Sequence, residues 1–147
     1  MLSDIYDDQD LLEEVLSYWD QAGQRPYEVL IEQGLYEFFL GQLEKASLML
    51  ENKIYRGTGR HSQLGVGDIL LYTYPTSWTY DLDTAKLFVE ELPNGVILVF
   101  SSDQPIKAIE NHKNTYREDE VIIHPLNLKV IKKYEKKGLT ILEVSPQ

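Results

Sequence analysis

Cysteine is absent from this 147-residue chain, so it can form neither a disulfide nor a thiolate metal site. No apolar run approaches the roughly 20 residues that a membrane-spanning helix needs, so we expect no transmembrane segment. The N-terminus is acidic and lacks a basic stretch followed by an apolar run. A secretory signal is therefore not expected, and the sequence predicts a cytoplasmic protein.

Positive charge is also scarce, because 24 acidic residues outweigh 14 lysines and arginines and give a net charge of -10. This balance argues against a broad electrostatic contact with nucleic acid or with an anionic membrane. Residues 1–24 contain seven acids and no basic residue, whereas five lysines gather near the C-terminus: Lys129, Lys132, Lys133, Lys136 and Lys137. We interpret these two regions as solvated faces.

The length and a hydrophobic content of 43% predict one compact domain with a single core over residues 1–147. Residues 1–52 are expected to be mainly helical. Apolar residues from Leu11 to Trp19 recur at helical spacing, and Pro26 is placed to begin a second helical region that is notched near Gly34 and Gly41.

Residues 53–147 predict a β-rich core, and helices followed by strands indicate the α+β class. The expected strands are short apolar runs bounded by turn residues: "KIYR", "DILLY", "GVILVF", "KAIEN", "EVIIHP", "LKVIKKY" and "LTILEVS". Gly138 is expected to supply a positive φ in a hairpin turn. One helix should interrupt the strands, capped by Asp83, with Ala85, Phe88 and Val89 facing inward.

Several familiar kinds of catalytic site are not supported. His61, His112 and His124 lie far apart without the spacing of metal ligands, so we expect no metal site. No nucleophile elbow is present, and the glycine-rich "GTGRHSQLGVG" matches neither the Walker pattern nor the dinucleotide fingerprint.

Three short stretches remain as candidates. In "IYRGTGR", Arg56 leaves a strand next to Gly57, and an arginine fork beside glycines suits a phosphate. In "YPTSWTYDLDTAKLF", Ser77 and Thr79 share one face of a strand and could orient a ligand. Each stretch also has a purely structural interpretation: a surface arginine at a strand end, or a core tryptophan flanked by two hydroxyls.

The third stretch is "YREDEVIIHP", where Glu118 and Glu120 are two residues apart at the start of a strand. Their side chains therefore point to the same side, and two neighbouring carboxylates need a cation or hydrogen bonds to compensate their repulsion. Acidic residues at the edge of a strand are also common without any catalytic role.

Taken in order, the three stretches resemble the arginine–serine–glutamate class of mono-ADP-ribosyltransferases. That family shows an aromatic-arginine-glycine strand, then a serine-x-serine/threonine strand with a short helix, then a glutamate-x-glutamate pair opening an apolar strand. The resemblance covers roughly residues 35–145 and implies a split, mostly antiparallel two-sheet β core behind the helices. Trp78, where the family more often has threonine, and the compact stretch after Arg60 are departures.

The resemblance implies NAD+ as co-substrate, with no metal. Arg56 would bind the pyrophosphate and adenosine side of NAD+, with Gly57 beside it. Glu120 would stabilise the positive charge that develops on the ribose when nicotinamide leaves. Ser77 would hold Glu120 in place, and Thr79 would shape the nicotinamide pocket.

The resemblance also implies how an acceptor is recognised. A glutamate at position 118 goes with arginine acceptors in the family, so Glu118 would pair with a target arginine. Tyr116, in the loop before the catalytic strand, would contact a target protein, which the acidic surface predicts to be basic. The absence of a signal favours an intracellular target, such as host machinery modified by a phage enzyme in the host cytoplasm.

Three other interpretations stay open at this point. An NAD glycohydrolase would use the same triad with water as acceptor. An inactive module could bind NAD+ or a partner without catalysis. The motif match could also be accidental and leave a generic α+β binding domain.

Overall fold

The structure is a computed structural model that describes residues 8–21, 26–111 and 119–147. The chain begins with three helices: α1 (Asp8–Gln21), α2 (Pro26–Glu32) and α3 (Tyr36–Lys45). None of the helices in the described residues is long and apolar enough to cross a membrane.

The helical region follows the predicted pattern with one difference. Pro26 is the first residue of α2, where its fixed φ suits the first turn. Gly34 separates α2 from α3 with a φ of 72°, a backbone conformation that glycine adopts without strain. Gly41 lies inside α3 and does not interrupt it, so the predicted notch there is wrong.

All seven predicted strands are present, and "TSWT" forms a further one. The strands are β1 (Ile54–Thr58), β2 (Ile69–Tyr72), β3 (Thr76–Thr79), β4 (Val96–Phe100), β5 (Ala108–Asn111), β6 (Glu120–Ile123), β7 (Leu126–Lys136) and β8 (Leu139–Pro146). The predicted change of character at residue 52 falls between α3 and β1. Gly138 has a φ of 81° in the turn between β7 and β8, as predicted.

The strands form one sheet in the order β2-β7-β8-β4-β1-β3-β6-β5, and only the β4–β8 pair is parallel. Helices followed by a mostly antiparallel sheet confirm the predicted α+β class. We predicted two sheets, but hydrogen bonds connect all the strands of the described residues into one. The two parts meet between β1 and β3, which share the single register pair Tyr55–Thr79.

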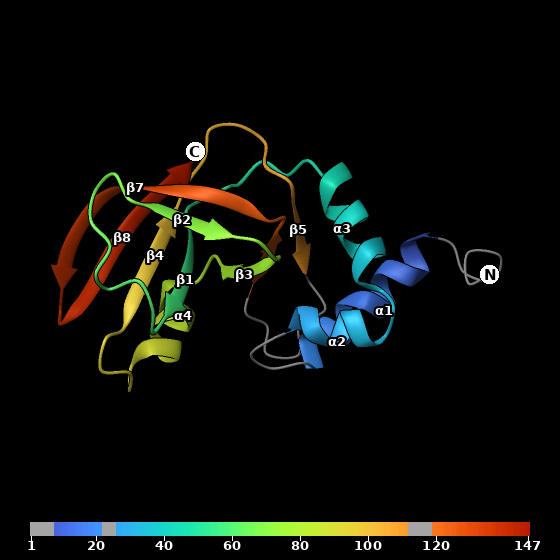
Figure 1. Cartoon of the computed structure of the whole chain (residues 1–147), viewed down its shortest axis with the longest axis horizontal. Coiled ribbons are helices and arrows are strands. Elements are labelled where there is room, and N and C mark those ends of the chain that lie inside the picture. Colours follow the sequence, from blue (N-terminus) through green and yellow to red (C-terminus); the bar gives the residue numbers. More distant parts are fainter. Residues whose placement is uncertain (1–7, 22–25, 112–118) are drawn as a thin grey trace.

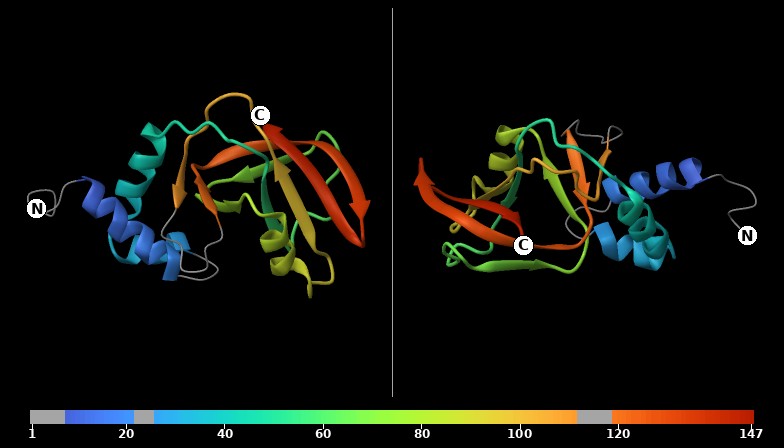
Figure 2. Two further views of the ribbon diagram at one scale, coloured as in Figure 1. Left: turned by 180° about the vertical axis from the view of Figure 1, so that it is seen from behind. Right: turned by 90° about the horizontal axis from the view of Figure 1, so that it is seen from above.

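The helices cover different parts of this sheet. Figures 1 and 2 show α1, α2 and α3 together beside β5, whereas α4 (Leu82–Val89) lies against β1. Ile122 of β6 belongs to the apolar cluster formed by the first three helices, with Val15, Trp19 and Phe39. The helical region and the sheet therefore share buried side chains.

Side-chain alternation along the strands separates two further clusters. The largest one contains Ile54, Trp78, Leu98 and Phe100, on one face of their strands. The other face of β4 turns Ile97 and Val99 toward Ala85 and Val89 of α4.

Helix α4 differs from the prediction in its cap and in one inward residue. Asp81, not Asp83, is the N-cap, and its side chain accepts a hydrogen bond from the Asp83 backbone N–H at 3.0 Å. Ala85 and Val89 are buried as predicted, but Phe88 is 60% exposed. Phe88 lies about 60° around the helix from Ala85, on the side away from Val89, so it falls outside the buried face.

At Gly57, strand β1 and helix α4 lie in close contact. A Cβ at this position would lie 2.4 Å from the Ala85 carbonyl oxygen and 3.2 Å from the Phe88 Cβ. Both obstacles belong to the helix near its backbone and cannot swing away. The sequence at position 57 is therefore constrained by helix packing, whatever else this strand contacts.

Replacing Gly57 with alanine is expected to lower the free energy of unfolding by about 1–3 kcal/mol, because the added methyl forces α4 away from β1. Gly41→Ala is the matched control: nothing lies within 4 Å of its Cβ position, and alanine favours the helix by about 0.5–1 kcal/mol. Urea denaturation measures both. Equal stabilities of the two variants would contradict this account of the contact.

Candidate active site

Buried polar side chains mark one place in the sheet. The described residues contain four buried polar or charged side chains outside the apolar core, namely Thr76, Thr79, Asn111 and Glu120. Thr79 of β3, Glu120 of β6 and Asn111 of β5 are direct cross-strand neighbours in one row. Because burying polar groups is costly unless they are paired, this row requires a network of hydrogen bonds.

Glu120 is the centre of that network. Its residue is 5% exposed, and its Oε2 accepts hydrogen bonds from the Ser77 hydroxyl and, at 3.0 Å, from the indole Nε1 of Trp19. Its Oε1 accepts a hydrogen bond from Asn111 Nδ2 at 2.8 Å. Hydrogen bonds of this kind to an ionised carboxylate offset the cost of removing its charge from water.

The local sequence explains why Glu120 faces these donors. Asp119, just before it, has a φ of 50°, an uncommon backbone conformation that precedes the start of β6. From Glu120 the side chains alternate, so Glu120 and Ile122 share the face that turns toward helix α1. Val121 and Ile123 point the other way, into the largest apolar cluster.

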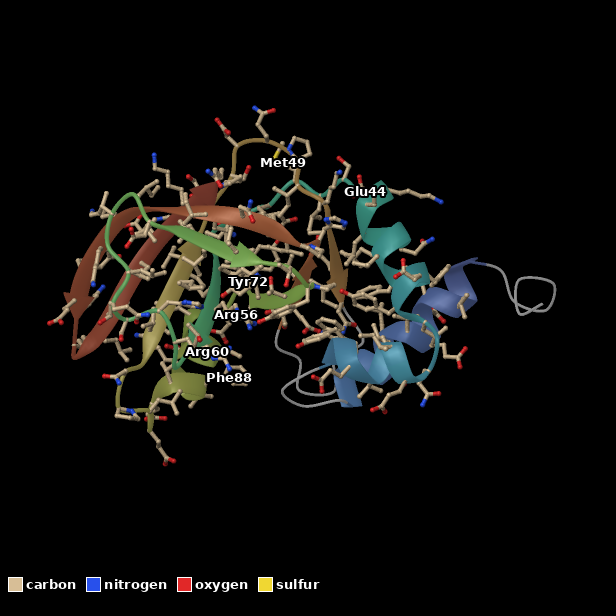
Figure 3. The ribbon with its side chains drawn as sticks, in the orientation of Figure 1. Glu44, Met49, Arg56, Arg60, Tyr72 and Phe88 are labelled. Carbon is tan, nitrogen blue, oxygen red and sulfur yellow. The ribbon has the colours of Figure 1, made fainter. Side chains whose placement is uncertain are left out.

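Arg56 reaches the same place from β1. Its Nη1 donates a hydrogen bond to the Ser77 carbonyl oxygen at 2.9 Å, and its guanidinium lies 5.6 Å from the centre of the Tyr72 ring. That distance fits a cation–π contact. The Arg56 Nε is buried without a hydrogen-bond partner. Figure 3 shows Arg56 between Tyr72 and Arg60.

The surroundings of Arg56 are positively charged. Burial, helped by the nearby Arg60 and Arg56 charges, holds the pKa of His61 below its ordinary value. Burial also raises the pKa of the Tyr72 phenol, with Arg56 acting in the opposite direction. A neutral imidazole and a neutral phenol beside two guanidinium groups leave this corner with a net positive charge, which suits an anionic ligand.

Ser77 therefore links the other two central residues of the sequence prediction, Arg56 and Glu120. Its carbonyl oxygen accepts from Arg56, and its hydroxyl donates to Glu120. These residues are 21 and 43 positions from Ser77 along the chain. The structure brings the Arg56 guanidinium, the Ser77 hydroxyl and the Glu120 carboxylate together.

The other predicted site residues lie as follows. Thr79 is buried beside Glu120, and its Oγ1 accepts a hydrogen bond from the Asp81 backbone N–H at 3.0 Å. Gly57 is next to Arg56, although the need for glycine there comes from α4. Glu118 and Tyr116 lie outside the described residues.

A hollow of about 820 Å³ lies elsewhere, lined by residues 101–107, 123–126 and 145–146. It adjoins the C-terminal end of β6, whereas Glu120 begins that strand. None of the residues that link Arg56 to Glu120 lines it. The hollow and the polar network are therefore separate features.

Comparison with known proteins gives results for structure only. No family model and no curated protein matches the sequence. Among solved structures, the ADP-ribosyltransferase Vis of Vibrio splendidus in complex with agmatine matches with a TM-score of 0.63 and 17% identity. This match covers 96% of our chain and 74% of that one. The chain has the ADP-ribosyltransferase fold.

Two further ADP-ribosyltransferase structures match the fold of this chain. C3larvin toxin from Paenibacillus larvae matches with a TM-score of 0.56 and 14% identity over 97% of our chain and 96% of that one. Exoenzyme S from Pseudomonas aeruginosa, in complex with human 14-3-3 protein beta and bound to Carba-NAD, matches with a TM-score of 0.57 and 15% identity, over 92% and 66%. Identities this low show a shared fold, and activity has to be argued from the site.

Three residues that contact Glu120 or Arg56 in this ADP-ribosyltransferase fold were not predicted from the sequence. Trp19 was placed only in the apolar stripe of its helix, and its indole N–H left no signal in the sequence. Tyr72 was placed only in a strand. Asn111 could have been found, because it ends the strand that pairs with the one beginning at Glu120, and the two ends must lie opposite each other.

NMR titration of the His61 imidazole measures its pKa, which reports the positive charge around it. We expect a midpoint below 6.5, because burial and both arginines disfavour the imidazolium, and Arg60→Ala should raise it. Since the unfolded chain takes up this proton more readily, acidification through pH 6.5 should lower the free energy of unfolding. Lys53→Ala is the control, and an equal shift in both variants would contradict the assignment to Arg60.

Proposed function

We propose that this protein is an NAD+-dependent mono-ADP-ribosyltransferase that transfers ADP-ribose to an arginine side chain of a protein and releases nicotinamide. The observation that carries the proposal is the hydrogen-bonded link from Arg56 through Ser77 to Glu120. It combines an anion-binding group and a buried carboxylate in one place, on a fold shared with ADP-ribosyltransferases.

Arg56 would bind a phosphate of NAD+. Its guanidinium is held by the Ser77 carbonyl oxygen and the Tyr72 ring, so little conformational entropy remains to be lost on binding. Arg60 and the neutral His61 lie on the same positively charged side. Gly57 and Thr79 would border the bound dinucleotide next to Arg56 and Glu120.

Glu120 would act on the ribose. When the bond between C1′ and the nicotinamide nitrogen breaks, nicotinamide leaves with the electron pair and positive charge develops on the ribose ring. A carboxylate bound to the ribose 2′-hydroxyl stabilises that charge as it forms, which lowers the barrier. Its hydrogen-bond donors are already in place, so the carboxylate needs little reorganisation during the reaction.

The acceptor nitrogen would then form the new bond to C1′ and lose one proton. Glu118 is the residue that we propose to orient an arginine acceptor and to take this proton. Agmatine, bound in the Vis structure, carries the same guanidinium group as arginine and supports this choice. Tyr116 would contact the target, and the chain's net charge of -10 favours a basic protein. The target that we propose is a cytoplasmic protein, such as one of a phage's host.

Release of nicotinamide from labelled NAD+ tests the proposal. Glu120→Gln keeps the size of the side chain but removes its charge, so we expect the rate to fall by about 10²–10³-fold. Glu143→Gln is the matched control, because Glu143 lies on β8 and pairs with Lys132 at 3.9 Å, outside the network. A Glu120→Gln variant as active as the control would show that the proposed chemistry is wrong.

The same assay, with a protein lysate added, separates transfer from hydrolysis. Label on protein arginine that disappears in Glu118→Gln, while nicotinamide release continues, supports arginine transfer. Nicotinamide release without any labelled protein in the wild type would identify an NAD glycohydrolase instead.

A further inference from the structure

Helix α1 brings the indole N–H of Trp19 into the candidate active site. The Trp19 residue is 3% exposed, and its indole Nε1 donates to Glu120 Oε2 at 3.0 Å across a separation of 101 residues. Among the α1 side chains that the structure describes, the other buried ones are apolar: Leu11, Val15 and Leu16. This indole therefore connects the helical region directly to the carboxylate.

The carboxylate needs such a contact because the terminal torsion of a glutamate is broad. Ser77 alone would restrain Oε2 at one point and leave the plane of the carboxylate free to rotate. Trp19 and Ser77 both donate to Oε2, while Asn111 donates to Oε1. Donors on both oxygens fix the plane as well as the position of the group.

Trp19 can serve as a fixed donor because its own ring is held by packing. The ring lies 5.5 Å from that of Phe39 on α3, tilted by 54°, and belongs to a cluster that includes Ile122 of β6. Two helices and the strand that begins at Glu120 thus set the direction of the indole N–H. Packed interiors leave such a side chain little freedom.

We propose that Trp19 is a positioning residue, which orients the Glu120 carboxylate toward the ribose through the indole N–H. This inference rests on the proposed function, because it concerns the same carboxylate. Trp19 contacts Glu120 and acts through it. Its loss should therefore slow the chemical step and leave the affinity for NAD+ nearly unchanged.

Trp19→Phe removes the N–H and keeps an aromatic ring. Because a hydrogen bond to a charged group contributes about 1.5–3 kcal/mol, its loss in the transition state should lower kcat for nicotinamide release about tenfold to a hundredfold. KM for NAD+ should stay within about twofold. Trp78→Phe is the matched control: Trp78 is also buried, and its Nε1 donates to Thr76 Oγ1 at 2.8 Å, away from Glu120.

The contact itself can be tested without NAD+. The chain has two tryptophans, so its ¹H–¹⁵N spectrum contains two indole signals that the two phenylalanine variants assign. We expect Glu120→Gln to shift the Trp19 signal and speed its hydrogen exchange, and to leave the Trp78 signal in place. An unchanged Trp19 signal would overturn the inference, even if Trp19→Phe fails to fold.

The outcomes separate the inference from the function on which it rests. Wild-type protein that leaves NAD+ intact overturns the proposed function, and the positioning role falls with it. Wild-type protein that cleaves NAD+, with Trp19→Phe equally fast, overturns the positioning role alone. A drop in kcat that is equal in both phenylalanine variants reflects general destabilisation and also overturns it.

Discussion

A carboxylate removed from water needs partners, and the way this protein supplies them to Glu120 organises its candidate active site. The donors come from a helix, from a strand beside β6 and from the strand on its other side: Trp19, Ser77 and Asn111. Leaving such a charge without partners would cost several kcal/mol. The contact between the helical region and the sheet therefore helps to hold this carboxylate in place.

Ser77 connects Glu120 to Arg56. Because it uses its hydroxyl for Glu120 and its carbonyl oxygen for Arg56, any shift of β3 moves the guanidinium and the carboxylate together. The two parts of the sheet meet at this strand, where β3 pairs with β1 on one side and β6 on the other. The proposed NAD+ site therefore lies at the junction of the two parts of the sheet.

The residues differ in how far the sequence alone could predict them. Short-range patterns made Arg56, Ser77 and Glu120 candidates, but each pattern also had a structural interpretation, and the expected roles came from the resemblance of the three stretches, taken in order, to a known family. Trp19 could not be found, since its role depends on how helix α1 packs against a strand a hundred residues away. Phe88 was misplaced because a helical stripe does not reveal where the buried face ends, which here follows from the close approach at Gly57.

We propose that Glu120 and Arg56 bind one NAD+ molecule between them. A crystal structure with a non-hydrolysable NAD+ analogue tests it most directly. We expect a ribose 2′-oxygen within about 3.2 Å of a Glu120 carboxylate oxygen and a phosphate oxygen within the same distance of the Arg56 guanidinium. An analogue seated in the hollow beside residues 123–126, with Glu120 untouched, would contradict it.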